Sequence, residues 1–200
     1  MLSNFAYREA IPFLAKHFTW ADEKDILGAA QSVYWYARLQ AAEWVADVRA
    51  ALPRVQEDET FKFLMYILME SRFEDACLLV PFFEHPSGQI RKSAIYTVGL
   101  LPEEKKAPFV DNFRRCLHDP DIYIKCTTVE ALRGLNTPEL LPAYEQLLTE
   151  HPQDDNYLLS YVMLRLDEMG KTALPVLKMA AAHPDRQIAE RANGLLEKYQ

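Results

Sequence analysis

A histidine-proline turn that recurs at nearly constant spacing is the feature that most restricts how this chain can fold. The four turn histidines lie 33, 33 and 32 residues apart, and proline follows each of them directly or after one aspartate: His85, His118, His151 and His183. A fixed period of this length is typical of stacked repeats, each built from one supersecondary unit. We therefore expect repeating units throughout the C-terminal part of the chain.

Each turn separates two helical patterns. The segment before the turn is apolar with an early proline, and we expect Pro108, Pro142 and Pro175 to mark helix starts, since the first turn of a helix does not use the amide proton that proline lacks. Pro81 is expected to kink its helix. The second helices are expected to start at four apolar residues: Ile90, Ile124, Leu158 and Ile188.

The residues four and eight positions after these starts are mostly apolar and fall on the same helical face as the starts. They are Ala94, Thr128, Val162 and Ala192, followed by Val98, Leu132, Leu166 and Leu196. A two-helix unit cannot enclose such a face alone, so neighbouring units must stack to complete the core. With six Gly and twelve Pro in 200 residues, the pattern predicts an all-α solenoid rather than a β fold.

The segments HDPDIYIKCTTVEALRGL and HPSGQIRKSAIYTVGLL resemble HEAT repeats, and the resemblance covers residues 74–200 as four repeats. It implies a right-handed α-α superhelix whose second helices form the inner, concave wall. It also implies an ion pair between Asp121 of the turn and Lys125, with Arg91 at the same basic position. Later repeats depart from the family pattern, because Leu159 and Ala189 occupy that position.

Residues 1–73 lack the turn signature but are also expected to be helical. FKFLMYILMESRF reads as a buried helix capped by Asp58 or Thr60, and DEKDILGAAQSVYWYARLQAAEWVADVRAALP reads as two more helices. Terminal units of solenoids are often atypical because one side faces water. We expect a capping region over residues 1–73 within one solenoid domain of residues 1–200.

Charge and composition restrict the partner and the compartment. The formal net charge of -7 disfavours nucleic acid and favours a basic protein partner. The three cysteines show no metal-ligand or redox spacing, which fits a reducing compartment. No apolar run approaches the roughly 18 residues of a membrane span, and the N-terminus lacks signal-peptide features. We expect a cytoplasmic protein that does not enter a membrane.

No catalytic or metal-binding pattern is apparent. One histidine per repeat spaces the imidazoles by about 8–10 Å, too far apart for a single metal ion, so we expect the histidines to cap turns. The His-Glu dipeptides of di-iron HEAT enzymes are absent. HEAT-like DNA glycosylases use tryptophans around the lesion, but Trp20, Trp35 and Trp44 are expected to serve in packing. We expect no enzyme activity, catalytic residue, cofactor or metal.

The helical register also indicates which side chains point away from the core. The positions one before and six after each start of a second helix form an aromatic and acidic stripe, which Asp154 and Asp155 extend. Tyrosine suits recognition because its ring offers contact area and its hydroxyl a polar tip. The alternative is that these rings fill gaps between helices. The predicted partner-binding residues are Tyr96, Tyr123, Glu130, Asp154, Asp155 and Tyr157.

These observations favour a protein-binding module. A narrower hypothesis is a bacterial immunity protein that neutralises a basic, nuclease-like toxin through the acidic and aromatic concave face. Two alternatives remain open: an assembly scaffold or lyase-like accessory protein, and a HEAT-like DNA glycosylase.

Overall fold

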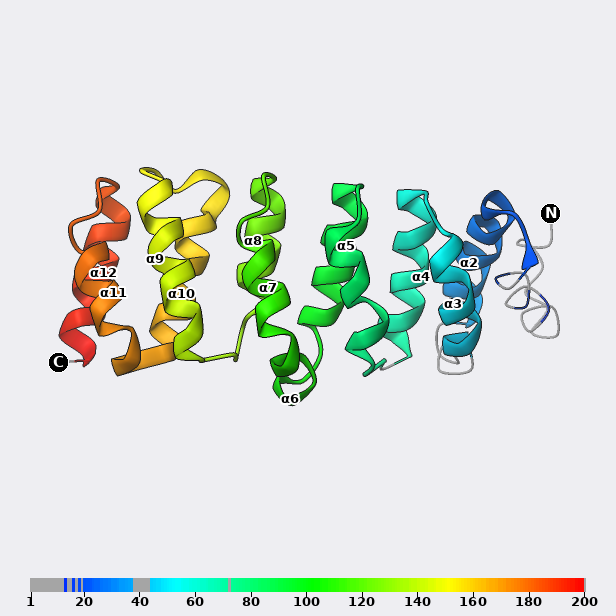
Figure 1. Cartoon of the computed structure of the whole chain (residues 1–200), viewed down its shortest axis with the longest axis horizontal. Coiled ribbons are helices and arrows are strands. Elements are labelled where there is room, and N and C mark those ends of the chain that lie inside the picture. Colours follow the sequence, from blue (N-terminus) through cyan, green and yellow to red (C-terminus); the bar gives the residue numbers. More distant parts are fainter. Residues whose placement is uncertain are drawn as a thin grey trace. The chain divides into compact units, whose positions relative to one another are not determined.

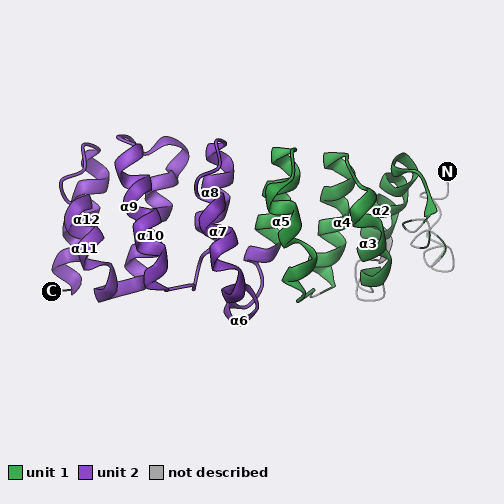
Figure 2. Cartoon of the chain, viewed as in Figure 1, with its two compact units in different colours: residues 1–97 green, residues 98–200 purple. Residues whose placement is uncertain are grey.

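The computed structural model describes residues 13, 16, 18, 20–37, 44–71 and 73–199, with the side chains of residues 36 and 37 left aside. Within these residues every regular element is a helix and none is a strand. The chain divides into two compact units, residues 1–97 and 98–200 (Figure 2). The expectation of one domain over residues 1–200 stays a prediction, and each unit is described by itself.

The first unit contains the helices α2 (Glu23–Ala37), α3 (Val45–Ala51) and α4 (Asp58–Glu70) (Figure 1). Both α2 and α3 pack against α4. Helix α4 is the expected buried helix, with Phe61, Leu64 and Leu68 fully enclosed. The predicted caps were wrong: Asp58 is already the first helical residue and Thr60 lies inside the helix, so Glu57 precedes it without a side-chain cap. The Asp58 carboxylate instead accepts a hydrogen bond from the Ser87 hydroxyl.

The first histidine-proline turn follows two short 3₁₀ helices, η5 (Ala76–Leu78) and η6 (Val80–Glu84), and leads into α5 (Gly88–Gly99). Pro81 lies at the start of η6, so this segment is two 3₁₀ turns rather than one kinked α-helix. Phe83 anchors it by burial.

The second unit alternates first and second helices of the repeats. Its elements are α6 (Glu103–Lys106), η7 (Ala107–Phe109), α7 (Val110–Cys116), α8 (Ile122–Ala131), η8 (Pro138–Leu140), α9 (Leu141–Glu150), η9 (Asp155–Tyr157), α10 (Leu158–Met169), η10 (Gly170–Ala173), α11 (Leu174–Ala180) and α12 (Arg186–Tyr199). Pro142 and Pro175 lie in the first turns of α9 and α11, as expected, while Pro108 begins η7 just before α7.

The helices of the second unit form two layers. Figure 1 shows α7 with α8, α9 with α10 and α11 with α12 as neighbouring pairs, and each pair is in contact. Helix α9 also contacts α11, while α10 contacts both α8 and α12. The first helices thus pack on first helices and the second helices on second helices, which is the stacking that the repeat pattern predicts.

The predicted core register of the second helices is confirmed. All twelve side chains of the three rows are buried: Ile90, Ala94, Val98, Ile124, Thr128, Leu132, Leu158, Val162, Leu166, Ile188, Ala192 and Leu196. The hydroxyl of the polar member, Thr128, donates to the Ile124 carbonyl at 2.7 Å within its own helix, so its burial leaves no unpaired group.

The turn histidines differ from one another. In the first and last turns, the imidazole Nδ1 of His85 and of His183 accepts a hydrogen bond from the amide two residues ahead, at 3.1 Å in both cases. His183 Nε2 then donates to the carbonyl oxygens of Leu148 and His151, both at 3.0 Å, which joins two successive turns. His118 is exposed, and His151 contacts Lys125. The predicted capping role is therefore seen at the first and last turns.

The ion pair implied between Asp121 and Lys125 was wrong. The Asp121 carboxylate caps α8 by accepting the amide of Tyr123 at 2.9 Å. Lys125 extends to the next turn, where its Nζ lies 3.8 Å from a Glu150 carboxylate oxygen. Asp121 binds the N-terminus of α8 instead of Lys125 because the first amides of a helix have no partner within the helix.

A buried lysine closes the opposite ends of the helices. The Lys106 ammonium donates to the carbonyl oxygens of Gly99 at 3.1 Å, Ala131 at 2.9 Å and Arg133 at 2.7 Å. Gly99 and Ala131 end their helices, where carbonyls lack an amide partner within the helix, and Arg133 lies in the turn after α8, so the ammonium satisfies these groups in place of water. Burial, followed by the positive charge of Arg165, lowers the pKa of Lys106.

Candidate functional site

The outward face of the second helices carries the predicted aromatic residues in exposed positions. In the second unit, Tyr123 is the second residue of α8 and is 56% exposed, and Tyr157 directly precedes α10 and is 72% exposed. Glu130 is exposed on α8, and Leu164 is exposed at the matching position of α10. Because α8 and α10 are in contact, these four side chains lie on one continuous face. We call it the α8–α10 face.

Tyr96 belongs to the first unit, where it is 49% exposed on α5. It occupies the position on α5 that Glu130 occupies on α8. The Tyr96 ring is therefore partly open to solvent on the first unit.

The backbone that presents Tyr157 adopts an unusual conformation. Asn156 and Tyr157 have φ angles of 54° and 63°, in the left-handed region that side chains with a Cβ avoid at a cost of about 1–2 kcal/mol per residue. The thiol of Cys126 on α8 donates to the Asn156 carbonyl oxygen at 3.5 Å. The strained residue carries a ring that is mostly in solvent, so core packing does not require it there.

Hydrogen bonds of Asp154 fix this segment to the start of α10. Its carboxylate accepts the amides of Leu159 at 2.7 Å and Ser160 at 3.2 Å, and also the Ser160 hydroxyl at 2.5 Å. Its backbone amide donates to the carboxylate of Asp185 at 3.1 Å. Of the two predicted aspartates, Asp154 is therefore engaged in capping α10, whereas Asp155 is exposed at the start of η9.

The negative charge of Glu130 acts on two neighbouring groups of the α8–α10 face. Burial, and after it the negative charges of Glu130, Asp154 and Asp121, raise the pKa of the Cys126 thiol to about 11. The pKa of the Tyr161 phenol is raised mainly by the charge of Glu130. The Glu130 carboxylate is thus among the causes of both pKa shifts.

Sequence reasoning did not single out Tyr161 or anticipate the burial of Cys126. Cys126 is buried because the left-handed segment before α10 covers it. Tyr161 lies one helical turn after Tyr157 on α10, and this i, i+4 spacing of two tyrosines is the signal that could have identified it.

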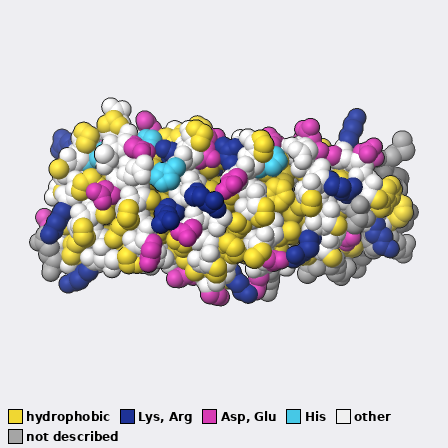
Figure 3. Space-filling view, viewed as in Figure 1, with side chains coloured by type: hydrophobic (Ala, Val, Ile, Leu, Met, Phe, Trp, Pro, Cys, Tyr) yellow, Lys and Arg dark blue, Asp and Glu magenta, His cyan; other side chains and the backbone are white. Residues whose placement is uncertain are grey.

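Glu130 has no ion-pair partner among the described residues. Ion pairs of the second unit involve other carboxylates, among them Asp111, Glu150, Asp167, Glu168 and Glu190. On the face shown in Figure 3, side chains of both signs lie interspersed, so no single-sign field covers it. Glu130 interacts instead with the Tyr161 side chain and with the charge of Arg165.

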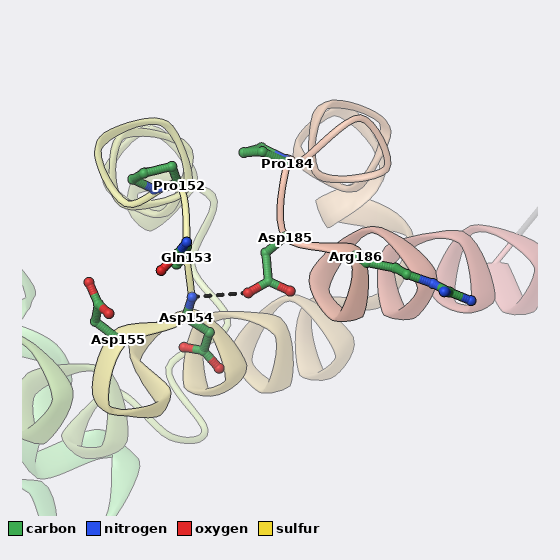
Figure 4. A pocket seen from close by; sticks show the side chains of 7 residues that line it. All are labelled: Pro152, Gln153, Asp154, Asp155, Pro184, Asp185 and Arg186. Carbon is green, nitrogen blue, oxygen red and sulfur yellow. Dashed lines mark hydrogen bonds between the residues drawn. The ribbon is translucent and has the colours of Figure 1, made fainter.

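An open pocket of about 570 Å³ lies between the α9–α10 turn and the α11–α12 turn (Figure 4). Its lining residues are Pro152, Gln153, Asp154, Asp155, Pro184, Asp185 and Arg186. Asp185 bridges the two turns, and backbone amides, that of Asp154 first, hold its carboxyl pKa below the usual range. The Arg186 guanidinium extends along α12 and pairs with Glu190 at 2.6 Å.

The described residues contain no group of three or more His, Cys, Asp or Glu side chains arranged to hold a metal ion. Of the three tryptophans expected to serve in packing, Trp44 is buried, whereas Trp20 and Trp35 are largely exposed. Trp35 contacts the Tyr34 ring edge to face, with centroids 5.1 Å apart.

Comparison with known proteins gives a fold and no family assignment. No protein-family model matches the chain, and no curated protein matches it. Among solved structures it is similar to a designed armadillo repeat protein in complex with the peptide (KR)4, with 14% sequence identity and a TM-score of 0.68. The match covers 95% of this chain and 99% of that chain. The chain has an armadillo-like α-solenoid fold.

This result confirms the repeat architecture inferred from the histidine-proline period. In the part of the chain that the structure describes, no helix is both long and apolar enough to span a membrane.

Proposed function

We propose that this chain is a protein-binding module that holds a basic polypeptide segment against the α8–α10 face. Tyr157 is the observation that carries the proposal. A bulky residue keeps a left-handed backbone conformation while its ring stays 72% exposed. Strain of this kind is typically retained where a side chain must be presented to a ligand.

The charges on this face support a basic partner. Glu130 lacks an ion-pair partner among the described residues, and its charge raises the pKa of the neighbouring Tyr161. A lysine or arginine of the partner would supply the missing positive charge and could lie over a tyrosine ring, where the electron-rich face attracts cations. The chain's net charge of -7 would steer such a partner from a distance.

The structural likeness adds a second line of support. The similar designed armadillo repeat protein was solved in complex with (KR)4, a peptide of alternating lysine and arginine. We infer that the same stacking of second helices presents a face for an extended basic segment in this chain. In this proposal Tyr123 and Tyr157 supply contact area and Glu130 supplies the charge.

The remaining predicted residues take lesser roles. Asp155, which is exposed, adds negative charge at the edge of the face. Asp154 acts indirectly, by capping α10 and so holding Tyr157 in place. Tyr96 offers a further contact on α5 of the first unit.

Neutralisation of a basic, nuclease-like toxin is the narrower form of this proposal, in which the bound segment belongs to the toxin. It requires that the captured partner be a nuclease and that the chain inhibit it in a cleavage assay. A partner captured without inhibition would favour the scaffold or accessory role instead.

The proposal is tested by calorimetric titration of the chain with synthetic (KR)4. Tyr157→Ala and Glu130→Gln should each weaken binding about five- to thirty-fold, corresponding to about 1–2 kcal/mol, while the melting temperature stays unchanged. Glu104→Gln on α6 is the matched control, because Glu104 is also exposed and the substitution removes the same charge elsewhere.

Wild-type protein that fails to bind (KR)4 would contradict the proposal. An effect of Glu104→Gln as large as that of Glu130→Gln would also contradict it, because it would show attraction by net charge rather than by this face.

A further inference from the structure

Lys125 and His151 make a contact that depends on protonation. The Lys125 side chain is only 13% exposed, and its Nζ lies 3.4 Å from His151 Nε2. An ammonium group has hydrogen-bond donors and no acceptor. The contact is therefore favourable only while the imidazole is neutral, with its proton on Nδ1 and the Nε2 lone pair facing the lysine.

The charges around His151 come from each neighbouring element. Lys125 approaches from α8, Glu150 from the end of α9 and Asp155 from η9, while His118 in the preceding turn acts on Glu150. On the other side, the His183 Nε2 donates to the His151 carbonyl oxygen. Burial, and then Lys125, lower the pKa of His151, against the opposing effect of Glu150 and Asp155.

His151 begins the connection that ends at Tyr157. The segment between them is held to α8 at two places, by the His151 contact with Lys125 and by the Cys126 thiol on the Asn156 carbonyl oxygen. It also lines the open pocket between the two turns (Figure 4). Because the segment is short, we expect a displacement of His151 to act on the left-handed backbone at Asn156 and Tyr157, although Asp154 between them is bonded to α10.

We propose that His151 is a pH-sensitive contact whose protonation displaces it from Lys125 and loosens the connection that carries Tyr157. The proton comes from solvent and enters at Nε2, where the resulting N–H can no longer accept from the ammonium. The displaced imidazolium then faces Glu150 and Asp155, which are negatively charged. This inference concerns the chain alone and does not require the proposed partner.

Hydrogen exchange measured by mass spectrometry tests it. In the wild-type chain, the exchange rates of peptides covering residues 151–158, corrected for the intrinsic pH dependence of exchange, should rise at least about threefold between pH 7.5 and a lower pH at which NMR of the His151 ring protons shows the imidazole protonated. His151→Gln keeps an acceptor for Lys125 and should show the same corrected rates at both pH values. His118→Gln removes an exposed turn histidine and should respond as the wild type does.

A second variant separates charge repulsion from a general effect of acid. In Lys125→Met the repelling charge is gone, so the pKa of His151, followed by NMR of its ring protons, should rise relative to wild type, and the acid-dependent loosening should disappear. Equal corrected rates in wild-type protein at both pH values would overturn the inference. A pH response that persists in His151→Gln or in Lys125→Met would overturn it as well.

Discussion

Asp154 and Glu130 show how two carboxylates of one surface serve different purposes. The backbone amides at the start of α10 occupy the carboxylate of Asp154, so its removal would first cost the helix cap. Glu130 makes no ion pair with a described residue, and its charge acts on Tyr161 and on the Cys126 thiol. Asp154 thus fixes the backbone of this surface, and Glu130 contributes negative charge to it.

The cysteines should differ in reactivity. Cys77 is exposed, whereas Cys116 and Cys126 are buried, and the pKa of Cys126 is raised to about 11. Because the thiolate is the nucleophile, native protein at pH 8 should release one equivalent of chromophore quickly with a disulfide reagent, and denatured protein three. Rapid reaction of a second thiol in native protein would show that the segment covering Cys126 opens readily.

The stability of the fold should decrease in mild acid because of His151. Its pKa is lowered in the folded chain from an ordinary value of 6.5, so between these two values the unfolded chain binds more protons. The free energy of unfolding should therefore fall as pH decreases from about 6.5 through the folded pKa, and remain reduced below it. Urea midpoints at pH 7.5 and 5.5 measure the loss, which should be smaller in His151→Gln. An equal loss in that variant would assign the acid sensitivity to other groups.

At the scale of helices, close packing fixes where the chain tolerates a larger side chain. Gly99 ends α5 against α8, and a Cβ atom at this position would lie 2.5 Å from the Cβ of Ala131 and 2.7 Å from its Cα. Gly194 lies within α12 and would meet no atom within 4 Å. The two glycines thus differ in packing although both are helical.

Replacing each glycine with alanine should have opposite effects. Gly99→Ala should destabilise the chain by about 1–3 kcal/mol, because backbone must move to relieve the overlap. Gly194→Ala should stabilise it by about 0.5–1 kcal/mol through helix propensity. Chemical denaturation of both variants measures the difference. A neutral Gly99→Ala would show that the ends of α5 and α8 are not in tight contact.

The second helices were the part of the structure that could be predicted most fully. Rows starting at Ile90, Ile124, Leu158 and Ile188 are buried because a helical period of 3.6 places them on one face, a property that needs no tertiary information. The cap of α4 and the two 3₁₀ turns around Pro81 depend on competing local hydrogen bonds, which a hydrophobic pattern does not reveal.

The exposure of the tyrosines on the α8–α10 face could be predicted from the sequence, but the backbone conformation that presents Tyr157 could not. The register placed Tyr123 and Tyr157 outward, and both are exposed. The left-handed backbone at Asn156 and the burial of Cys126 arise from contact between two repeats that are 30 residues apart in the chain. Pairing of that kind does not follow from the periodicity of one helix.

At the scale of the whole molecule, repeated helices supply a scaffold whose outward rows can vary without disturbing the core. The same buried rows recur in each repeat, while the outward positions at the starts of successive second helices hold Tyr123, Tyr157 and Gln187. A solenoid therefore gains specificity by changing surface side chains on a constant frame. In this chain the aromatic and acidic choices concentrate on α8 and α10.

The most direct test of the binding proposal is the footprint of (KR)4 on the isotopically labelled chain, measured by amide chemical-shift changes in NMR. We expect the largest changes on residues 123–130 and 154–164, the segments that carry the side chains of the α8–α10 face, and we expect them to diminish as salt screens the charges. Changes concentrated on the first helices α9 and α11, with residues 123–130 unaffected, would contradict the account.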